Sequence, residues 1–460
     1  MQADRSCWPP HGKRVDACAP GAGGQRQLLY NLLLTWGLVG SLPVSLPWAL
    51  TSAKRRATML QRLGLTAFKP FGRRDPSNPV RRVWVHALSV GEVRSAIPLV
   101  KHWRRTFKAD ALVFSTSTHT GYKVARLELG TSVEALFYYP YDVIFSVKRA
   151  IRRVAADVVV LVETDIWPNY LFEMRRRNVP VMLVNAKLSE RSWRGYRRWG
   201  ALIRPLFSSF TLVCAQTAKD AERFEQLGVR PERLHVTGNI KFDQALPPDG
   251  SLADLPVRLD LQPGQGTIVA GSTHPGEEAL IGDAWKALRG QHGDLKLVVA
   301  PRDPARAAEI RRLYRRSGHE VMMLSQALRA EKSRAYDVLV VDRIGMLSRL
   351  YALADVAIVG GSLVPCGGHN PLEPAAWSKP IIFGADMSDF ELVARMLVDG
   401  GGAWQVRDPA GLTRALQALF KDKQRARAVG QNAYLVFKRN QGTVARTINV
   451  ISAFREAQDQ

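Results

Sequence analysis

Residues 157–186 read DVVVLVETDIWPNYLFEMRRRNVPVMLVNA. The stretch holds two runs of aliphatic residues, 157–164 and 179–186, and the segment between them is long enough for a helix. Unbroken aliphatic runs are typical of strands in a parallel sheet that helices cover on both faces. We therefore interpret this stretch as two strands of an α/β domain joined by a helix.

The same pattern recurs along the chain. In the first half it predicts further strands at 83–88, 111–117, 210–217 and 233–238. In the second half it predicts strands at 267–272, 295–301, 319–324, 337–342, 356–361 and 380–384. Between the halves lies QALPPDGSLADLPVRLDLQPGQG (244–266), whose Pro, Gly and Asp content is typical of a linker. The sequence thus predicts two doubly wound, Rossmann-like α/β domains.

The flanking segments complete the predicted organisation. Residues 1–27 are rich in Pro and Gly and show no period, which indicates a disordered extension or a start placed too far upstream. The predicted segments are a disordered extension (1–27), a membrane anchor (28–50), an N-terminal domain (51–245), a linker (246–266), a C-terminal domain (267–440) and a C-terminal helix (441–460).

The predicted anchor reads LLYNLLLTWGLVGSLPVSLPWAL and has no charge, so it is long enough to cross a bilayer. Pro43 and Pro47 would kink or end a helix, which leaves a shallow or re-entrant anchor as an alternative. A cleaved signal peptide fits less well, because no small-residue cleavage site follows. The basic residues between Lys54 and Lys69 indicate that the main body lies in the cytoplasm, although Lys13, Arg14 and Arg26 weaken this argument.

Charge and missing motifs narrow the function. The chain has 460 residues and a net charge of +24, which favours polyanionic partners such as nucleic acid, anionic lipid or phosphorylated substrates. Its four cysteines form no CxxC pair, so neither a zinc ribbon nor a redox motif is indicated. GxGxxG, GxxxxGK[ST] and Asp-x-Asp motifs are absent from the sequence, which argues against dinucleotide dehydrogenases, P-loop enzymes and a metal held by paired aspartates.

In such sheets, ligands bind beyond the carboxyl ends of the strands. Glu92 follows strand 83–88 and could act as a general base, but Ser89-x-x-Glu92 is also a helix-capping box. Glu163 ends a run of five aliphatic residues, where a carboxylate is costly unless it is paired or used, so we favour a functional site. Lys241 could stabilise a departing phosphate, or it could be a surface lysine paired with Asp243.

In the second half, GGSLVPCGGHNPLEPAAW (360–377) is the most specific motif. Its two Gly pairs would let the backbone approach a ligand closely, and Asn370 to Glu373 predict a helix start with Asn as N-cap and Pro at the first position. A phosphate would bind there, or Glu373 would hold ribose hydroxyls. The hydroxyl-rich loops 115–121 and 271–274 suit sugar, phosphate or plain capping, and Arg302 suits a nucleotide phosphate or base.

The motifs WVHALSVGE (84–92), LVETDIWPN (161–169), VTGNIKFD (236–243), VAGSTHPGEE (269–278) and GGSLVPCGGHNPLEPAA (360–376) occur in this order. Together they resemble the bacterial 3-deoxy-D-manno-octulosonic acid (Kdo) transferases, over residues 28 to 440. The resemblance implies a GT-B fold, in which two Rossmann-like domains face a cleft. It implies inverting, metal-independent transfer of Kdo from CMP-Kdo to a lipid A precursor (lipid IVA) in lipopolysaccharide core biosynthesis, without a cofactor.

By the same resemblance, the N-terminal domain takes the acceptor and the C-terminal domain takes the CMP-sugar. Glu92 is the implied general base, and Glu163 and Lys241 are the implied transition-state stabilisers. The implied donor contacts are Pro301, Arg302, Ile344, Gly345, Met346, Asn370, Pro371, Leu372 and Glu373. Met346 stands where many members have glutamate, so a side-chain contact with CMP would be lost while backbone contacts would survive. Lys187 replaces a frequent arginine.

Two rival functions remain. One is another GT-B-like nucleotide-sugar enzyme, such as a 2-epimerase, which needs no lipid acceptor. The other is nucleic-acid binding, but the sequence shows no helix-turn-helix, zinc-finger or RNP motif. An anionic inner-membrane surface and a phosphorylated lipid acceptor explain the positive charge more simply. We therefore expect catalytic domains in the cytoplasm, bound peripherally to the inner membrane or held there by a single-pass N-terminal anchor.

Overall fold

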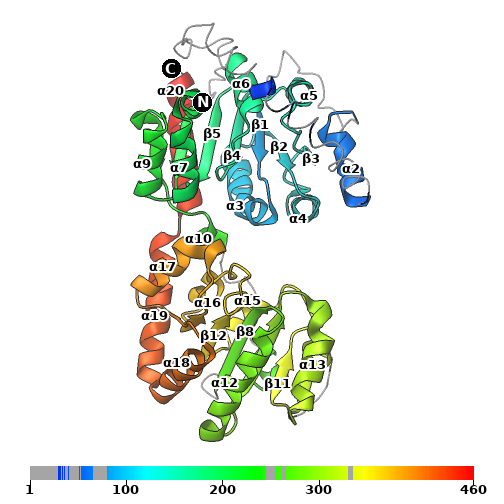
Figure 1. The fold of residues 1–460 in the computed structure, drawn as a ribbon, viewed down its shortest axis with the longest axis vertical. Coiled ribbons are helices and arrows are strands. Elements are labelled where there is room, and N and C mark those ends of the chain that lie inside the picture. The colour runs from blue at the N-terminus through cyan, green and yellow to red at the C-terminus, as the bar shows by residue number, and fades with distance from the viewer. Residues whose placement is uncertain are drawn as a thin grey trace, which may run out of the picture. The chain divides into compact units, whose positions relative to one another are not determined.

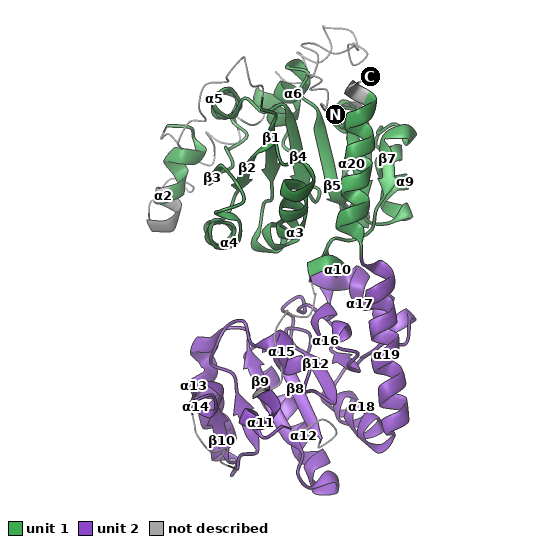
Figure 2. Ribbon diagram, turned by 180° about the vertical axis from the view of Figure 1, so that it is seen from behind, with its two compact units in different colours: residues 1–244, 442–460 green, residues 245–441 purple. Residues whose placement is uncertain are grey.

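The computed structural model describes residues 30–32, 34, 36, 40, 51, 53–65, 80–244, 254–261, 266–329 and 335–459. The chain divides into two compact units: unit 1 comprises residues 1–244 and 442–460, and unit 2 comprises residues 245–441 (Figures 1 and 2). Each unit is built on a seven-stranded sheet in which all strand pairs are parallel. The predicted pair of parallel α/β domains is confirmed.

The sheet of unit 1 has the strand order β3-β2-β1-β4-β5-β6-β7. Its strands are β1 (Arg82–His86), β2 (Ala111–Thr116), β3 (Ala135–Tyr138), β4 (Val158–Val162), β5 (Val181–Ala186), β6 (Leu212–Ala215) and β7 (Leu234–Val236). Its helices are α2 (Ala53–Arg62), α3 (Val90–Thr106), α4 (His119–Leu129), α5 (Ile144–Val154), α6 (Pro168–Arg176), α7 (Glu190–Arg198), α8 (Gly200–Phe207), α9 (Ala218–Gln226), η1 (Pro231–Arg233), α10 (Lys241–Gln244) and α20 (Thr443–Asp459).

Both faces of this sheet are buried, as the unbroken aliphatic runs require. Trp84 of β1 packs into a cluster with α5, α6 and α8, whereas its neighbours Val83 and Val85 pack into a second cluster with α3, α4 and α20. Alternate residues of one strand therefore serve two hydrophobic cores. This arrangement leaves the carboxyl ends of the strands as the edge where polar side chains can gather.

The sheet of unit 2 has the strand order β10-β11-β9-β8-β12-β13-β14. Its strands are β8 (Thr267–Thr273), β9 (Lys296–Pro301), β10 (Val321–Met323), β11 (Val338–Val340), β12 (Val356–Val359), β13 (Ile381–Phe383) and β14 (Ala403–Gln405). Its helices are α11 (Asp254–Leu259), α12 (Glu277–His292), η2 (Pro304–Arg306), α13 (Ala307–Arg316), α14 (Leu324–Ala327), α15 (Leu347–Tyr351), α16 (Leu372–Ala376), η3 (Ser388–Phe390), α17 (Glu391–Asp399), α18 (Pro409–Lys421) and α19 (Lys423–Asn440).

Each of the twelve strands predicted from aliphatic runs overlaps a strand of the structure. Two further strands, β3 and β14, were missed. Both lie at the edge of a sheet, and they have only four and three residues, ALFY and AWQ. Short edge strands carry a weak signal, although the other two edge strands, β7 and β10, were predicted with three residues each.

The C-terminal helix α20 belongs to unit 1, as Figure 2 shows. The Asp243 carboxylate accepts hydrogen bonds from the backbone N–H groups of Gly442 (2.7 Å) and Val444 (2.6 Å), which fixes the start of the helix. Near its other end, Arg455 donates two hydrogen bonds to the Asp110 carboxylate, at 2.7 and 3.2 Å. The chain thus returns to complete the core beneath α3.

Truncation of Ile451 tests this role of α20. Its side chain is fully buried in the cluster that α20 shares with α3 and the sheet. We expect Ile451→Ala to lower the free energy of unfolding of unit 1 by about 2–5 kcal/mol, because it leaves a cavity. Leu127→Ala, at an 83% exposed position of the same unit, is the matched control. Equal unfolding midpoints in urea for both variants would contradict the assignment of α20 to this core.

Of the predicted anchor, the described residues are 30–32, 34, 36 and 40. Across the described part of the chain, no helix combines the length and apolar character needed to span a membrane. Two polar side chains of the segment bond to unit 1: the Tyr30 hydroxyl donates to Asp142 (3.0 Å), and Asn31 exchanges hydrogen bonds with Asn169 (2.9 and 2.7 Å). Trp36 is 75% exposed. The predicted extension 1–27 lies outside the described residues.

Candidate active site

Glu92 lies in the first turn of α3, directly beyond the carboxyl end of β1. The Ser89 hydroxyl accepts a hydrogen bond from the backbone N–H of Glu92 (3.4 Å), so the helix is capped as the sequence predicts. The Glu92 carboxylate accepts the N–H of Leu88 at 2.6 Å. A hydrogen bond with the backbone N–H of Ser89, the reciprocal contact of a capping box, also acts on Glu92 and lowers its pKa. The predicted helix capping is therefore present, and capping alone does not account for the other acids near Glu92.

The pKa of the Glu92 carboxyl is raised to about 7. Burial is the main cause, and the negative charges of Glu163 and Asp165 add to it, against the lowering effect of the hydrogen bonds at Leu88 and Ser89. A carboxyl group with this pKa is partly ionised at neutral pH and can accept a proton from a hydroxyl. The structure therefore brings Glu92 and Glu163 together electrostatically at the ends of β1 and β4.

Glu163 is a buried residue with φ of 62°, in the left-handed region that glycine favours. Such strain at a bulky residue recurs at functional sites. Its carboxylate pairs with Lys187 (3.2 Å) and accepts a long hydrogen bond from the side-chain amide of Asn185 (3.5 Å). The carboxylate is thus paired, and Lys187 supplies the opposite charge.

Lys241 is the first residue of α10, and it is half-buried. The N–H of the preceding Ile240 donates to the side-chain oxygen of Asn185 (3.0 Å), the same amide that reaches Glu163. One asparagine therefore connects the loop before Lys241 to the Glu163 carboxylate. Asp243 was the alternative partner of Lys241. Its two carboxylate oxygens accept the backbone N–H groups of Gly442 and Val444.

A buried histidine that the sequence analysis missed supports this cluster. Nε2 of His86 lies 3.1 Å from Asp165 Oδ2, and Nδ1 lies 3.0 Å from both oxygens of Ser115. The ring also stacks on Tyr139, with centroids 3.8 Å apart. These contacts fix the Asp165 carboxylate, whose charge contributes to the raised pKa of Glu92. A histidine within an aliphatic strand (RVWVH) was the available signal.

In unit 2, the strand order reverses between β8 and β12, which is the point where ligands bind in doubly wound sheets. The loops after these two strands are joined by Glu277, a fully buried residue at the start of α12. One of its carboxylate oxygens accepts the N–H groups of His274 (2.8 Å) and Gly361 (2.7 Å). The other accepts those of Ser362 (3.1 Å) and Leu363 (2.9 Å). In the sequence, Glu277 carries no pattern that marks it as a site residue.

The glycines of 360–368 are closely surrounded by other atoms of the protein. A Cβ atom would lie 2.6 Å from the Ser272 carbonyl oxygen at Gly360 and 2.8 Å from the Asp389 carboxylate at Gly367. Gly367 and Gly368 also have φ of 84° and 70°. Packing and backbone conformation within the protein therefore explain these glycines. That they also let the backbone approach a ligand stays a prediction.

The helix expected at Asn370 is short. The Asn370 side chain accepts the N–H of Leu372 (3.1 Å), but α16 runs only from Leu372 to Ala376, with Pro371 as its N-cap residue. The helix thus begins one residue later than predicted. A five-residue helix has a small dipole, so an anion at its start would be bound by the individual backbone N–H groups more than by the helix dipole. Glu373, in its first turn, is near Tyr351: burial, together with the Glu373 charge, holds the pKa of that phenol well above its usual range.

Pro301 ends β9 and is buried, whereas Arg302 directly beyond it is exposed. The N–H of Arg302 donates to the carbonyl oxygen of Thr273, the last residue of β8 (3.0 Å). The predicted donor residues near 301 and 370 therefore lie at the carboxyl ends of β9 and in the loop after β12. Those at 344–346 lie just before α15, beyond β11.

Residues 57–244 match the family model of 3-deoxy-D-manno-octulosonic-acid transferase (kdotransferase). The 3-deoxy-D-manno-octulosonic acid transferase of Bordetella pertussis is 31% identical over 425 residues, which cover 91% of this chain and 97% of the relative. That of Haemophilus influenzae is 32% identical over 379 residues, or 82% of this chain and 88% of the relative. The chain belongs to the bacterial Kdo transferase family. It is therefore a glycosyltransferase, which separates it from the epimerase and nucleic-acid-binding alternatives.

Solved structures agree with the fold of this Kdo transferase. The UDP-GlcNAc 2-epimerase of Neisseria meningitidis bound to UDP-GlcNAc is 13% identical, with a TM-score of 0.55 over 80% of this chain and all of that chain. The S. aureus MnaA–UDP co-structure is 14% identical, with a TM-score of 0.54 over 82% and 97%. At such identities the likeness concerns the fold alone. It supports the GT-B-like architecture; that the two domains face a cleft stays a prediction.

The loop 344–346 of this Kdo transferase holds the predicted donor residues Ile344, Gly345 and Met346. Ile344 is 86% exposed, and Gly345 has φ of 88°, which favours glycine. The Met346 side chain packs against the hydrophobic cluster that includes Leu339 and Leu350. It thus contributes to the core next to α15, and only the backbone of this loop is available for polar contacts with a nucleotide.

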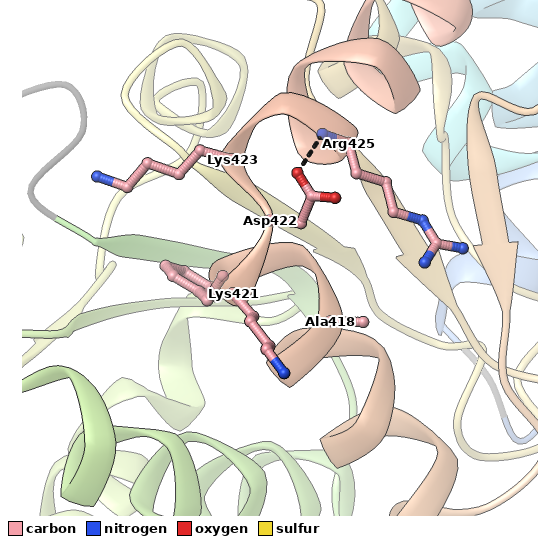
Figure 3. A pocket seen from close by; sticks show the side chains of 6 residues that line it. Ala418, Lys421, Asp422, Lys423 and Arg425 are labelled. Atoms are coloured by element: carbon pink, nitrogen blue, oxygen red, sulfur yellow. Dashed lines mark hydrogen bonds between the residues drawn. The ribbon is translucent and has the colours of Figure 1, made fainter.

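A hollow of about 580 Å³ in this Kdo transferase lies elsewhere in unit 2 (Figure 3). It is lined by Ala418, Phe420, Lys421, Asp422, Lys423 and Arg425, where α18 ends and α19 begins. A Cβ atom at Gly266, directly before β8, would lie 3.8 Å from the Phe420 ring, so the hollow lies near the amino end of β8. Its single carboxylate, Asp422, caps α19 by accepting the N–H of Arg425 (2.9 Å). We assign no reaction to it. Among the described residues, no cluster of His, Cys, Asp and Glu is suited to a metal.

Proposed function

We propose that this enzyme transfers Kdo from CMP-Kdo to a lipid A precursor, lipid IVA, with inversion at the anomeric carbon, and releases CMP. In this proposal it acts in lipopolysaccharide core biosynthesis. The observation that carries the proposal is the Glu92 carboxyl, whose pKa is about 7 beside Glu163 and Asp165 at the strand ends of unit 1. In a chain of the Kdo transferase family, a base of this kind suits activation of a sugar hydroxyl.

The proposed reaction is a single displacement. Glu92 takes the proton of the acceptor hydroxyl as its oxygen attacks the anomeric carbon of Kdo. The bond from that carbon to the phosphate oxygen breaks, and the electron pair stays on the phosphate. Glu163 stabilises positive charge on the sugar, and Lys241 stabilises negative charge on the phosphate. Attack from the face opposite the leaving group inverts the configuration.

The proposal assigns the lipid acceptor to unit 1 and the donor to unit 2. Donor contacts come from Pro301, Arg302 and the loop 344–346, together with residues 370–373. Support comes from their positions at the carboxyl ends of the strands of unit 2. Arg302 offers a planar cation for the phosphate. The Leu372 N–H donates to the Asn370 side chain, which fixes the start of α16. No cofactor is needed for this reaction.

We also propose that the enzyme works at the anionic surface of the inner membrane, with both catalytic domains in the cytoplasm. The net charge of +24 supports this location, since basic residues are attracted to anionic lipid. Trp36 and Leu32 of the N-terminal apolar segment are exposed, while Tyr30 and Asn31 of the same segment bond to unit 1. The segment would thus attach unit 1 to lipid, peripherally or as a single-pass anchor.

The pH dependence of transfer follows from Glu92. Its base form is populated only above a pKa of about 7, so we expect kcat/KM to rise with pH through about 7. Burial is the main cause of the raised pKa, and the charge of Glu163 is the second. Glu163→Gln should therefore shift the rise of kcat/KM to lower pH without abolishing it. The exposed Glu128→Gln is the control. If kcat/KM of Glu163→Gln rises at the same pH as that of the wild type, the carboxyl groups of Glu92 and Glu163 do not interact.

A donor comparison separates this function from that of an enzyme with the same fold. The protein is incubated with CMP-Kdo or with UDP-GlcNAc, each with and without lipid acceptor. We expect CMP release that depends on the lipid, and no turnover of UDP-GlcNAc. Conversion of UDP-GlcNAc without any acceptor would instead support 2-epimerase chemistry and refute the proposal.

A further inference from the structure

Two histidines meet at the point of unit 2 where the strand order reverses. His274 follows β8 directly, and His369 lies in the loop after β12. Their Nε2 atoms are 2.8 Å apart, and the rings are nearly parallel, with 14° between the planes and centroids 5.1 Å apart. The crevice beyond such a reversal is where sheets of this type bind ligands. Both lie in loops that the sequence marked as candidate ligand sites, 271–274 and 360–377, but neither histidine was given a role.

The pair is held in place by groups already described. A Cβ atom at Gly361 would lie 3.0 Å from the His369 ring and 3.4 Å from the His274 ring, so both rings sit over this glycine. Glu277 binds the backbone N–H groups of both His274 and Gly361. One buried carboxylate therefore fixes the backbone of His274 and of the glycine beside the His369 ring, which favours a preorganised site.

The electrostatic surroundings favour an anion. The pKa of His369 is lowered to about 4 by burial, with further lowering by the positive charge of Arg302 and by His274. The charged groups that face the pair are Arg302, from the loop after β9, and Glu277, from the start of α12. The carboxylate of Glu277 is already occupied by four backbone N–H groups. A phosphate bound beside Arg302 would supply the negative charge that raises the pKa of the pair.

The hydrogen-bond chemistry of the pair leaves two atoms for a ligand. In a bond between the two Nε2 atoms, one ring donates and the other accepts, so one Nδ1 carries hydrogen and the other a lone pair. Within the part of the chain that the structure describes, this is the only hydrogen bond of either ring. If the pair takes up one proton, both Nδ1 atoms become donors, and a donor of this kind can bind a phosphate oxygen.

We propose that His274 and His369 bind the phosphate of the donor, take up one proton as it binds, and pass that proton to the leaving phosphate oxygen. This inference rests on the proposed Kdo transfer. The bond between the anomeric carbon and the phosphate oxygen breaks, the electron pair stays on that oxygen, and the imidazolium proton joins it. The acceptor's proton goes to Glu92. CMP leaves as the hydrogen phosphate and gives up its proton to water, which returns the pair to its neutral form.

Calorimetry on the full-length protein tests proton uptake without any transfer reaction. CMP, cytidine and free Kdo are each titrated at about pH 7.5, in buffers with different ionisation enthalpies. We expect uptake of about one proton with CMP and none with cytidine, which lacks the phosphate. Uptake with free Kdo alone would place the sugar carboxylate at the pair and overturn the assignment, and so would the absence of uptake with CMP.

Variants connect the pair to turnover. His369→Asn and His274→Asn should each abolish proton uptake, weaken CMP binding and lower kcat about 10²-fold. His292→Asn, at an exposed position of unit 2, is the control and should behave as wild type. If the wild type shows CMP-linked uptake but transfers no Kdo, the proposed function fails and the phosphate site stands. If the wild type transfers Kdo and both histidine variants keep normal kcat and uptake, this inference fails alone.

Discussion

Glu92→Gln lowers kcat for Kdo transfer by about 10²–10⁴-fold while CMP-Kdo binds with near-normal affinity. Glutamine keeps an oxygen that can accept the Leu88 N–H, so the start of α3 is preserved, but it cannot take a proton from the acceptor. Glu92 belongs to unit 1, whereas the proposed donor contacts belong to unit 2. Transfer rates and CMP affinity of the purified variant measure the two effects separately.

The stability of the same variant distinguishes a functional carboxylate from a capping one. The folded-state pKa of Glu92, about 7, lies above the value of an unfolded glutamate, so its ionisation weakens the fold as pH rises from that value to about 7. Above about pH 8, Glu92→Gln should raise the free energy of unfolding of unit 1 by about 1–3 kcal/mol. Glu128→Gln, on the exposed side of α4, should leave both turnover and stability unchanged. Normal turnover in Glu92→Gln would refute its role as base.

Glu277→Ala destabilises unit 2 by about 3–5 kcal/mol and abolishes measurable CMP binding. The substitution leaves four backbone N–H groups without their shared acceptor and frees two loops that this carboxylate joins. Denaturant unfolding of unit 2 and CMP titration are the two measurements.

Two further variants make the Glu277 prediction specific. Glu277→Gln should also destabilise unit 2. One carboxylate oxygen of Glu277 accepts two backbone N–H groups, and the NH₂ group of glutamine at that place would be a donor facing donors. Glu391→Gln, at an exposed position of α17, is the control. If Glu277→Gln unfolds at the wild-type denaturant concentration and binds CMP normally, the carboxylate does not organise the donor site.

The strands of this fold were predictable because buried strands leave an unbroken aliphatic run, as DVVVLV does around β4. β3 (ALFY) and β14 (AWQ) were missed because their short sequences hold no aliphatic run, whereas the equally short edge strand β10 begins with a valine and was predicted. The unit to which α20 belongs depends on contacts of Asp243 and Arg455, and the latter reaches Asp110, 345 residues away in the sequence. No local pattern encodes such a pairing.

The candidate site shows the same division. Glu163 stood out in the sequence because a carboxylate at the end of a buried strand is unusual in itself. Glu92, in the first turn of α3, was left between a general base and a capping box, and only the resemblance implied the choice. Glu277 and the pair of His274 and His369 could not be predicted, since their roles arise where two loops meet: Glu277 lies 84 residues from Gly361, and the histidines are 95 apart. The resemblance to Kdo transferases contributed the donor and the acceptor, which no contact within the chain specifies.

Kdo transfer to a lipid is tested most directly by a product assay. The purified protein is incubated with CMP-Kdo and a tetraacylated lipid A precursor, and the mass of the lipid product is measured by mass spectrometry. We predict a lipid heavier by one or more Kdo residues, in an amount that matches the CMP released. A lipid of unchanged mass while CMP-Kdo is consumed, or no consumption of CMP-Kdo at all, would contradict the account.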